Sequence, residues 1–246
     1  KLIDGYGVLP VLLRDETRPT TLKQRFRASG KTLLRVSHLR QHNISQELAD
    51  QMLAEITHRL PETDLILFSD FNYGCLPDSV VVQIIQKALE VGVPIVADSQ
   101  ASSQIGDISR FQGMALITPT ELEARLAVNK SAESLVVLSE QLLRKAECNN
   151  IIMTLGPDGV LIRTGNLSSP DSLPTDRIAA LNSKPQDVAG AGDSLFCMAS
   201  LALTAGADIW TAGLLGSVAA ACQVSRVGNT PLTATEVVQM LEKRVL

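Results

Sequence analysis

The residues from Asp187 to Ser194, with the sequence DVAGAGDS, have the clearest potential for chemistry in this chain. Gly190 and Gly192 are separated by one residue and precede a long, alanine-rich stretch that is expected to be helical. Glycines allow a tight turn that presents consecutive N–H groups, and the start of a helix adds partial positive charge. This combination predicts a site for a phosphate group. Asp193 would stand beside the anion and could accept a proton from an attacking hydroxyl.

The same residues have a purely structural interpretation. Asp193 would then only cap the helix, and the glycines would only make a turn. A dinucleotide-binding fingerprint is excluded, because its third glycine would fall where Leu195 stands. The spacing alone leaves the phosphate site and the structural turn equally open.

Two further segments carry candidate groups. The stretch TLGPDG, from Thr154 to Gly159, joins two apolar runs and is typical of a hairpin turn. Glu121 and Glu123 follow an expected strand that ends at Thr118, and parallel sheets bind ligands at the carboxyl ends of their strands. A carboxylate there could hold Mg²⁺ through water, or it could be an exposed acid in the first turn of a helix.

These groups need a scaffold, and the chain beyond residue 44 alternates short apolar runs with longer amphipathic stretches. Strands are expected at 64–69, 93–97, 114–118, 150–155 and 160–164. Helices are expected at 77–91, from 119, at 131–147, and near 191–205, 208–226 and 233–243. This alternation predicts an α/β fold whose mostly parallel sheet has helices on both faces.

The first 36 residues follow a different pattern. Residues 8–13 and 20–36 are expected to be short strands of a small sheet that projects from the main body. Basic side chains alternate along it and could contact a sugar phosphate, although a solvated strand face explains them as well. Residues 166–174, rich in Ser, Pro and Asn, are expected to form a surface loop.

The composition excludes several classes of protein. Hydrophobic residues make up 45% of the chain and aromatic residues only 3%, so the core must be aliphatic. The net charge of −4 argues against general nucleic-acid binding. We expect no membrane partner either, because no apolar run approaches the ~20 residues of a membrane span. The chain has four widely spaced cysteines, which are typical of buried free thiols in the cytoplasm.

The ordered set of segments resembles the ribokinase-like carbohydrate kinases of the phosphofructokinase B type. Residues 187–193 resemble the carboxyl-terminal signature of that family, and residues 154–159 its nucleotide-side hairpin. Residues 118–123, TPTELE, look like its T-P-N-x-x-E segment, and residues 219–228 look like the helix that flanks adenine. The resemblance covers about residues 15–243.

The resemblance implies a three-layer α/β/α kinase that uses ATP and Mg²⁺. Asp193 would be the base, and the backbone N–H groups of Gly190, Ala191 and Gly192 would stabilise the transferring phosphoryl group. Glu123 would organise magnesium through water. The nucleotide would contact Thr154, Gly156, Gly159, Ala221, Val224 and Gly228.

The remaining expectations concern the substrate and the assembly. Asp187 would belong to the loop that binds K⁺ in some members, and Asp70, Asn72 and Lys23 would face the acceptor. Residues 18–25 and 68–74 look most like heptose 7-phosphate kinases, so a sugar or sugar phosphate is the expected substrate. Residues 1–36 would be the remnant of a lid sheet and the amino-terminal part, and residues 37–246 the nucleotide-binding core. The lid sheet would form a homodimer.

The chain also departs from the family pattern. We expect it to be incomplete at its amino-terminal end, since the family carries further strands, a Gly-Gly motif and a sugar-binding Asp before the point where Lys1 aligns. Thr120 replaces an asparagine, and Gln100 and Tyr73 replace lysines. These departures support an alternative, a weak or inactive kinase relative that binds nucleotide or acts as an assembly subunit.

Overall fold

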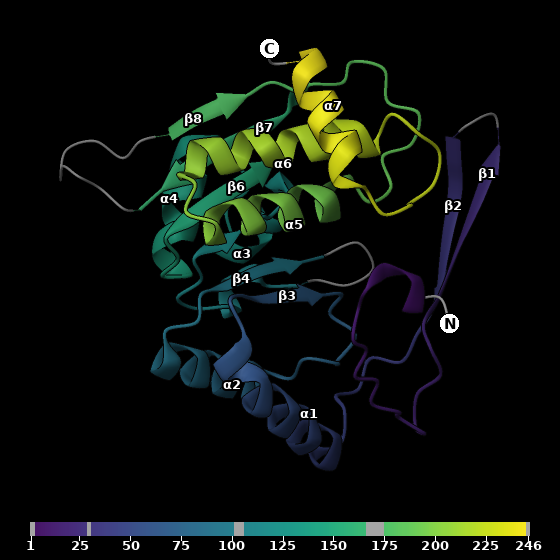
Figure 1. The fold of residues 1–246 in the computed structure, drawn as a ribbon, viewed down its shortest axis with the longest axis vertical. Coiled ribbons are helices and arrows are strands. Elements are labelled where there is room, and N and C mark those ends of the chain that lie inside the picture. Colours follow the sequence, from purple (N-terminus) through teal and green to yellow (C-terminus); the bar gives the residue numbers. More distant parts are fainter. Residues whose placement is uncertain (1–2, 29–30, 101–105, 166–174, 245–246) are drawn as a thin grey trace.

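A six-stranded sheet forms the centre of the protein in the computed structural model, which describes residues 3–28, 31–100, 106–165 and 175–244 (Figure 1). In spatial order its strands are β3 (Ile66–Asp70), β4 (Ile95–Ser99), β5 (Leu116–Ile117), β6 (Asn150–Thr154), β7 (Val160–Thr164) and β8 (Thr175–Ile178). The pairings from β3 to β6 are parallel, and the last two are antiparallel. The mostly parallel sheet is therefore confirmed.

Helices cover both faces of this sheet. They are α1 (Gln46–Arg59), α2 (Asp78–Val91), α3 (Glu121–Val128), α4 (Leu135–Lys145), α5 (Ala191–Thr204), α6 (Ile209–Gln223) and α7 (Ala234–Arg244). The first four contribute to one hydrophobic core, and α5 and α6 contribute to the other. The three-layer α/β/α arrangement is confirmed.

Strand β6 shows why the sequence produces two cores. Ile151, Ile152 and Met153 are consecutive and each is 0% exposed. Successive side chains of a strand point to opposite faces, so both faces must be covered. Ile151 and Met153 belong to the core beneath α1 to α4, whereas Ile152 belongs to the core beneath α5 and α6. A continuous apolar run is thus typical of this doubly covered strand.

The small projecting sheet is a hairpin of β1 (Leu22–Ala28) and β2 (Lys31–His38). It extends away from the main body (Figure 1). Strand β2 ends at His38, two residues beyond residue 36, where the lid segment was expected to end. The strand expected at 8–13 is wrong, because this segment is irregular. Pro10 lacks a backbone N–H for a strand ladder, and Leu9 beside it is 82% exposed.

Other expectations need smaller corrections. The helix expected at 131–147 begins only at Leu135, after Ser134 caps it by accepting a hydrogen bond from the Val137 N–H. Strand β8 was not expected, and the loop expected at 166–174 lies outside the described residues. All four cysteines are free, but Cys75 and Cys197 are exposed rather than buried. No helix in the described ranges is long and apolar enough to cross a bilayer.

Candidate active site

The glycine bend forms the start of α5. Gly190 is the N-cap residue with φ of 79°, and a Cβ added there would lie 2.1 Å from Asn229 Oδ1. Both the left-handed backbone and the close approach therefore require glycine. Gly192 is exposed and lies in the first helical turn, where N–H groups have no intrahelical partner. The bend thus presents donors and the positive end of the helix to solvent.

Asp193 lies three residues beyond the N-cap and is partly buried. Its Oδ1 accepts a hydrogen bond from Nε2 of Gln100 at 3.1 Å. Because Gln100 directly follows β4, this contact joins the helix start to the carboxyl end of a parallel strand. The carboxylate is therefore linked across the site rather than only to its own helix.

A large cavity opens beside the bend, with a volume of about 1090 Å³. Five of the six residues expected to contact the nucleotide line it, together with two residues of the bend: Thr154, Gly156, Gly159, Ala221, Val224, Ala191 and Gly192. Most of the remaining lining is aliphatic. A cavity of this size, with a helix start at its wall, suits a nucleotide whose phosphates reach the bend.

The segment from Thr154 to Gly159 is both a hairpin turn and a wall of this cavity. Residues 156–158 form a single 3₁₀ turn between antiparallel β6 and β7, and the Leu155 N–H donates to the Gly159 carbonyl at 2.8 Å. Gly156 and Gly159 have φ of 60° and 90°. The segment is therefore a hairpin turn that also lines the cavity, and its contact with a nucleotide stays a prediction.

Glu123 forms a capping box at the start of α3. Its Oε2 accepts a hydrogen bond from the Thr120 N–H at 2.8 Å, and the Thr120 hydroxyl accepts one from the Glu123 N–H at 3.2 Å. The side chain is buried, not a solvated helix acid. The described part of the chain holds no group of three or more metal-ligating side chains. Magnesium commonly needs only one or two carboxylates besides phosphates and water, so Glu123 fits a water-mediated role.

Asp187 connects two loops beneath the bend. Its Oδ1 accepts a hydrogen bond from the Ala189 N–H, and its Oδ2 accepts one from the Gly228 N–H, both at 3.2 Å. Gln223 supports the same junction by donating to the Gly228 carbonyl at 2.9 Å. Gly228 thus anchors the loop and is not among the residues that line the large cavity. K⁺ binding by this loop stays a prediction.

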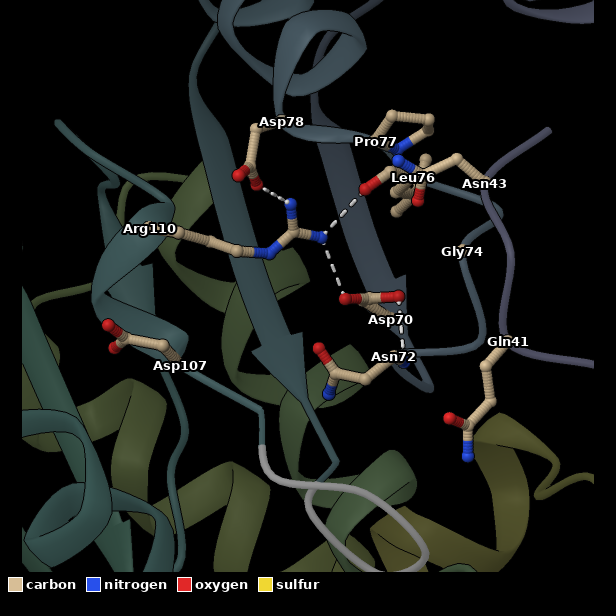
Figure 2. A pocket seen from close by; sticks show the side chains of 10 residues that line it. All are labelled: Gln41, Asn43, Asp70, Asn72, Gly74, Leu76, Pro77, Asp78, Asp107 and Arg110. Carbon is tan, nitrogen blue, oxygen red and sulfur yellow. Dashed lines mark hydrogen bonds and ion pairs between the residues drawn. The ribbon is translucent and has the colours of Figure 1, made fainter. Parts of the chain in front are cut away.

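A second cavity of about 290 Å³ lies at the carboxyl end of β3 (Figure 2). Asp70, only 4% exposed, receives the Arg110 guanidinium at 2.8 Å and the Asn72 N–H at 3.0 Å. Arg110 also binds Asp78 and the Leu76 carbonyl. Asp70 and Asn72 therefore line the same polar cavity, both carboxylate oxygens of Asp70 are bonded within the protein, and contact with an acceptor stays a prediction.

The lid contacts the same region through Lys23. Its Nζ lies 4.3 Å from the centroid of the Phe71 ring and 5.2 Å from that of the Tyr73 ring. These cation–π contacts hold the ammonium of the lid over the loop that carries Asn72. Lys23 thus contacts the neighbours of Asn72 in the chain but is not among the residues that line the second cavity, and its contact with a substrate stays a prediction.

Comparison with known proteins identifies the family of this chain. The family model described as pfkB family carbohydrate kinase matches residues 4–235.

The chain belongs to the pfkB family of carbohydrate kinases.

Relatives of this pfkB family chain include proteins named bifunctional protein HldE. That of Desulfatibacillum aliphaticivorans is 30% identical over 234 residues, covering 94% of this chain and 46% of the relative. That of Bradyrhizobium diazoefficiens is 29% identical over 240 residues, covering 96% and 47%. The chain thus spans about half the length of these relatives.

Solved structures agree on the fold. Ribokinase from Giardia lamblia superposes with a TM-score of 0.75 at 18% identity, covering 97% of this chain and 77% of that one. Phosphofructokinase-2 from Escherichia coli, in complex with substrates and products, gives a TM-score of 0.70 at 16% identity, covering 91% and 70%. The expected ribokinase-like fold is confirmed.

Three polar residues of the pfkB site had no role assigned from the sequence. Asp98 is buried at the end of β4, where it accepts a hydrogen bond from the Thr118 hydroxyl at 3.1 Å. Gln100 follows two residues later, and Arg110 enters from a separate 3₁₀ turn. The rule that ligands bind at the carboxyl ends of strands could have found the first two. No local signal marks Arg110.

Proposed function

We propose that this chain transfers the γ-phosphoryl group of Mg-ATP to a hydroxyl of a sugar or sugar phosphate. One observation carries the proposal. The bend from Gly190 to Gly192 opens onto the large cavity, and Asp193 beside it is bonded to Gln100, which in turn contacts Asp70 and Asn72 of the acceptor cavity. A chain of contacts thus links Asp193, beside the space proposed for nucleotide, to two residues of the cavity proposed for the sugar.

The geometry supports a direct transfer. The acceptor hydroxyl oxygen would form a bond to the γ-phosphorus while the bond to the β–γ bridging oxygen breaks, releasing ADP. Asp193 would take the hydroxyl proton and later return it to solvent. The N–H groups at the start of α5 would stabilise the charge on the moving phosphoryl oxygens. Magnesium, organised by Glu123 through water, would neutralise charge on the nucleotide phosphates.

Heptose 7-phosphate is the acceptor we propose. The segments 18–25 and 68–74, which resemble heptose 7-phosphate kinases, meet in the structure where Lys23 stands over Phe71 and Tyr73. A lid cation at this position suits the phosphate of a sugar phosphate. The family membership and the relatives named HldE support the same substrate class.

The lid also supports a proposal about assembly. Phe26, Leu33 and Leu34 of the hairpin are 52%, 71% and 55% exposed. Exposed apolar side chains gathered on one element favour association. We propose that the chain forms a homodimer through this sheet, which sedimentation at micromolar concentration would test.

The function is tested by Asp193→Asn, which keeps the shape of the side chain but removes the base. We expect turnover to fall by about 10²- to 10⁴-fold, the usual contribution of one positioned base. ATP affinity, measured by calorimetry, should stay within about twofold because the cavity and its N–H donors are unchanged. Asp50→Asn, on an exposed position of α1, is the matched control.

A variant Asp193→Asn with full turnover would show that the assigned base is wrong. The alternative, an inactive relative, is favoured by Gln100 standing where kinases of this type usually have lysine. It predicts that the complete wild-type polypeptide binds ATP but releases no ADP on any sugar of a panel that includes heptose 7-phosphate.

A further inference from the structure

The side chain of Gln100 makes one contact that the proposed chemistry leaves unexplained. Its Nε2 donates to Oδ1 of Asp193 at 3.1 Å, between residues that are 93 positions apart in the sequence. Both side chains are partly buried. A primary amide is an uncharged donor, so it can hold a carboxylate without supplying or accepting a proton during the reaction.

The backbone of Gln100 is fixed independently of its side chain. Its N–H donates to the Asp70 carbonyl at 2.9 Å, and its own carbonyl accepts a hydrogen bond from Asn72 Nδ2, also at 2.9 Å. Asn72 has φ of 57°, a left-handed conformation that asparagine tolerates. Gly106 makes room for it, since a Cβ added at Gly106 would lie 2.2 Å from Asn72 Nδ2.

Asp70 is itself locked in place. The Arg110 guanidinium holds its Oδ2 at 2.8 Å, and the Asn72 N–H holds its Oδ1 at 3.0 Å (Figure 2). The Arg110–Asp70 ion pair, the Asn72 amide and the end of β4 thus fix the backbone position from which the Gln100 side chain extends. The chain of contacts runs from the acceptor cavity to the carboxylate at the start of α5.

We propose that Gln100 is a positioning residue for the Asp193 base, an inference that rests on the proposed function. With Oδ1 held by the amide, the carboxylate is confined to one rotamer and Oδ2 is left to receive the proton of the acceptor hydroxyl. Because Gln100 is bonded to Asp70 and Asn72, the base is aligned with the same cavity that holds the acceptor. Proton transfer requires such alignment within hydrogen-bond reach.

Two substitutions test this assignment. Gln100→Leu removes the donor at similar volume, and Gln100→Glu keeps the length but places a second carboxylate against Asp193. Neither alters the two backbone contacts of Gln100. We expect kcat to fall about 10- to 100-fold, because a small misplacement of a catalytic group costs this much. The KM for ATP and the melting temperature should match those of wild type and of the control Gln83→Leu, at an exposed position of α2.

A purely structural role would lower the melting temperature and leave kcat of the folded fraction unchanged, which would overturn the proposal. A second readout needs no turnover. The side-chain amide resonance of Gln100 in a ¹H–¹⁵N spectrum should move in Asp193→Asn and stay in place in Asp50→Asn. An unmoved resonance would contradict the contact on which the proposal stands.

The two proposals fail in different ways. A complete wild-type polypeptide that releases no ADP on any sugar overturns the kinase function and, with it, the role of Asp193 as a base. An active wild type whose Gln100→Leu variant keeps kcat within twofold overturns only the role of Gln100.

Discussion

Gly159 provides a sharp test of how the hairpin shapes the nucleotide cavity. Its backbone has φ of 90° and ψ of −131°, and a Cβ added there would lie 2.0 Å from the Ile178 carbonyl oxygen. The next nearest atoms, 2.7 Å away, are backbone atoms of Ala179 and Ala180. Gly156, in the same turn, has φ of 60° and nothing within 4 Å of an added Cβ. The two positions therefore separate backbone strain from steric overlap.

The magnitudes follow from this difference. Gly156→Ala carries only the left-handed strain, about 1–2 kcal/mol. Gly159→Ala carries backbone strain of about 1–3 kcal/mol and an overlap that costs a further 1–3 kcal/mol or so. No flexible side chain can relieve that overlap, since all three neighbours are backbone. We expect a free energy of unfolding about 4 kcal/mol below wild type for Gly159→Ala and about 1.5 kcal/mol below it for Gly156→Ala.

Urea unfolding followed by circular dichroism measures both losses under the same conditions, and calorimetry measures ATP binding. Ala179 and Ala180 line the large cavity, so the movement forced by Gly159→Ala should also weaken ATP binding. Gly156→Ala, whose added Cβ meets no atom within 4 Å, should weaken ATP binding less than Gly159→Ala does. If the two variants lose equal stability, the close approach of β8 to Gly159 is not what requires glycine there.

Two further predictions concern the edges of the site. Thr120→Ala removes the capping box and should lower the free energy of unfolding, measured in urea, by about 1 kcal/mol. Thr120→Asn should leave it almost unchanged, because asparagine is an equally good cap. Equal losses of stability in the two variants would refute the role of the cap. Although Cys197 is an exposed residue, partial desolvation of its thiol, followed by the charges of Asp193 and Asp98, raises the pKa of that thiol. Cys197 should therefore stay protonated at pH 8 and react with iodoacetamide more slowly than a free cysteine. Asp193→Asn should speed this reaction, which mass spectrometry would measure. An unchanged rate would contradict the electrostatic coupling between the two residues.

Local chemistry made much of the fold predictable. The turn residues Gly156 and Gly159 have positive φ in the structure, which is the conformation their types favour. Gly92 ends α2 at φ of 74°, where the sequence predicts the stop. Each of these signals lies within a few residues of the feature that it determines. The strand predicted at 8–13 is wrong because apolar composition alone does not provide a neighbouring strand to pair with. Pro10 also lacks the backbone N–H that would donate to such a neighbour.

The polar links of the site could not be predicted in this way. Arg110 reaches Asp70 across 40 positions, and Gln100 reaches Asp193 across 93. Neither pair has a spacing that marks it in one sequence, because the sheet, not the local chain, brings the partners together. The sequence could mark Asp193 as a candidate base but not Gln100 as its hydrogen-bond partner.

If Asp193 is the base, as we propose, the two cores explain why it needs a hydrogen-bond partner outside its own helix. Asp193 stands on α5, which packs on one face of the sheet. Asp70 is bonded to Arg110, whose neighbours Ile108 and Phe111 belong to the core on the other face. A base and an acceptor site built on different layers would shift relative to each other with any change in packing. Gln100 directly follows β4 and is bonded to Asp193 on one side and to Asp70 on the other. In our proposal the sheet therefore fixes the position of Asp193 relative to the cavity proposed for the sugar. Gln100→Leu should thus loosen that position without disturbing either core, and a lower kcat in a protein of unchanged stability is the signature that this arrangement predicts.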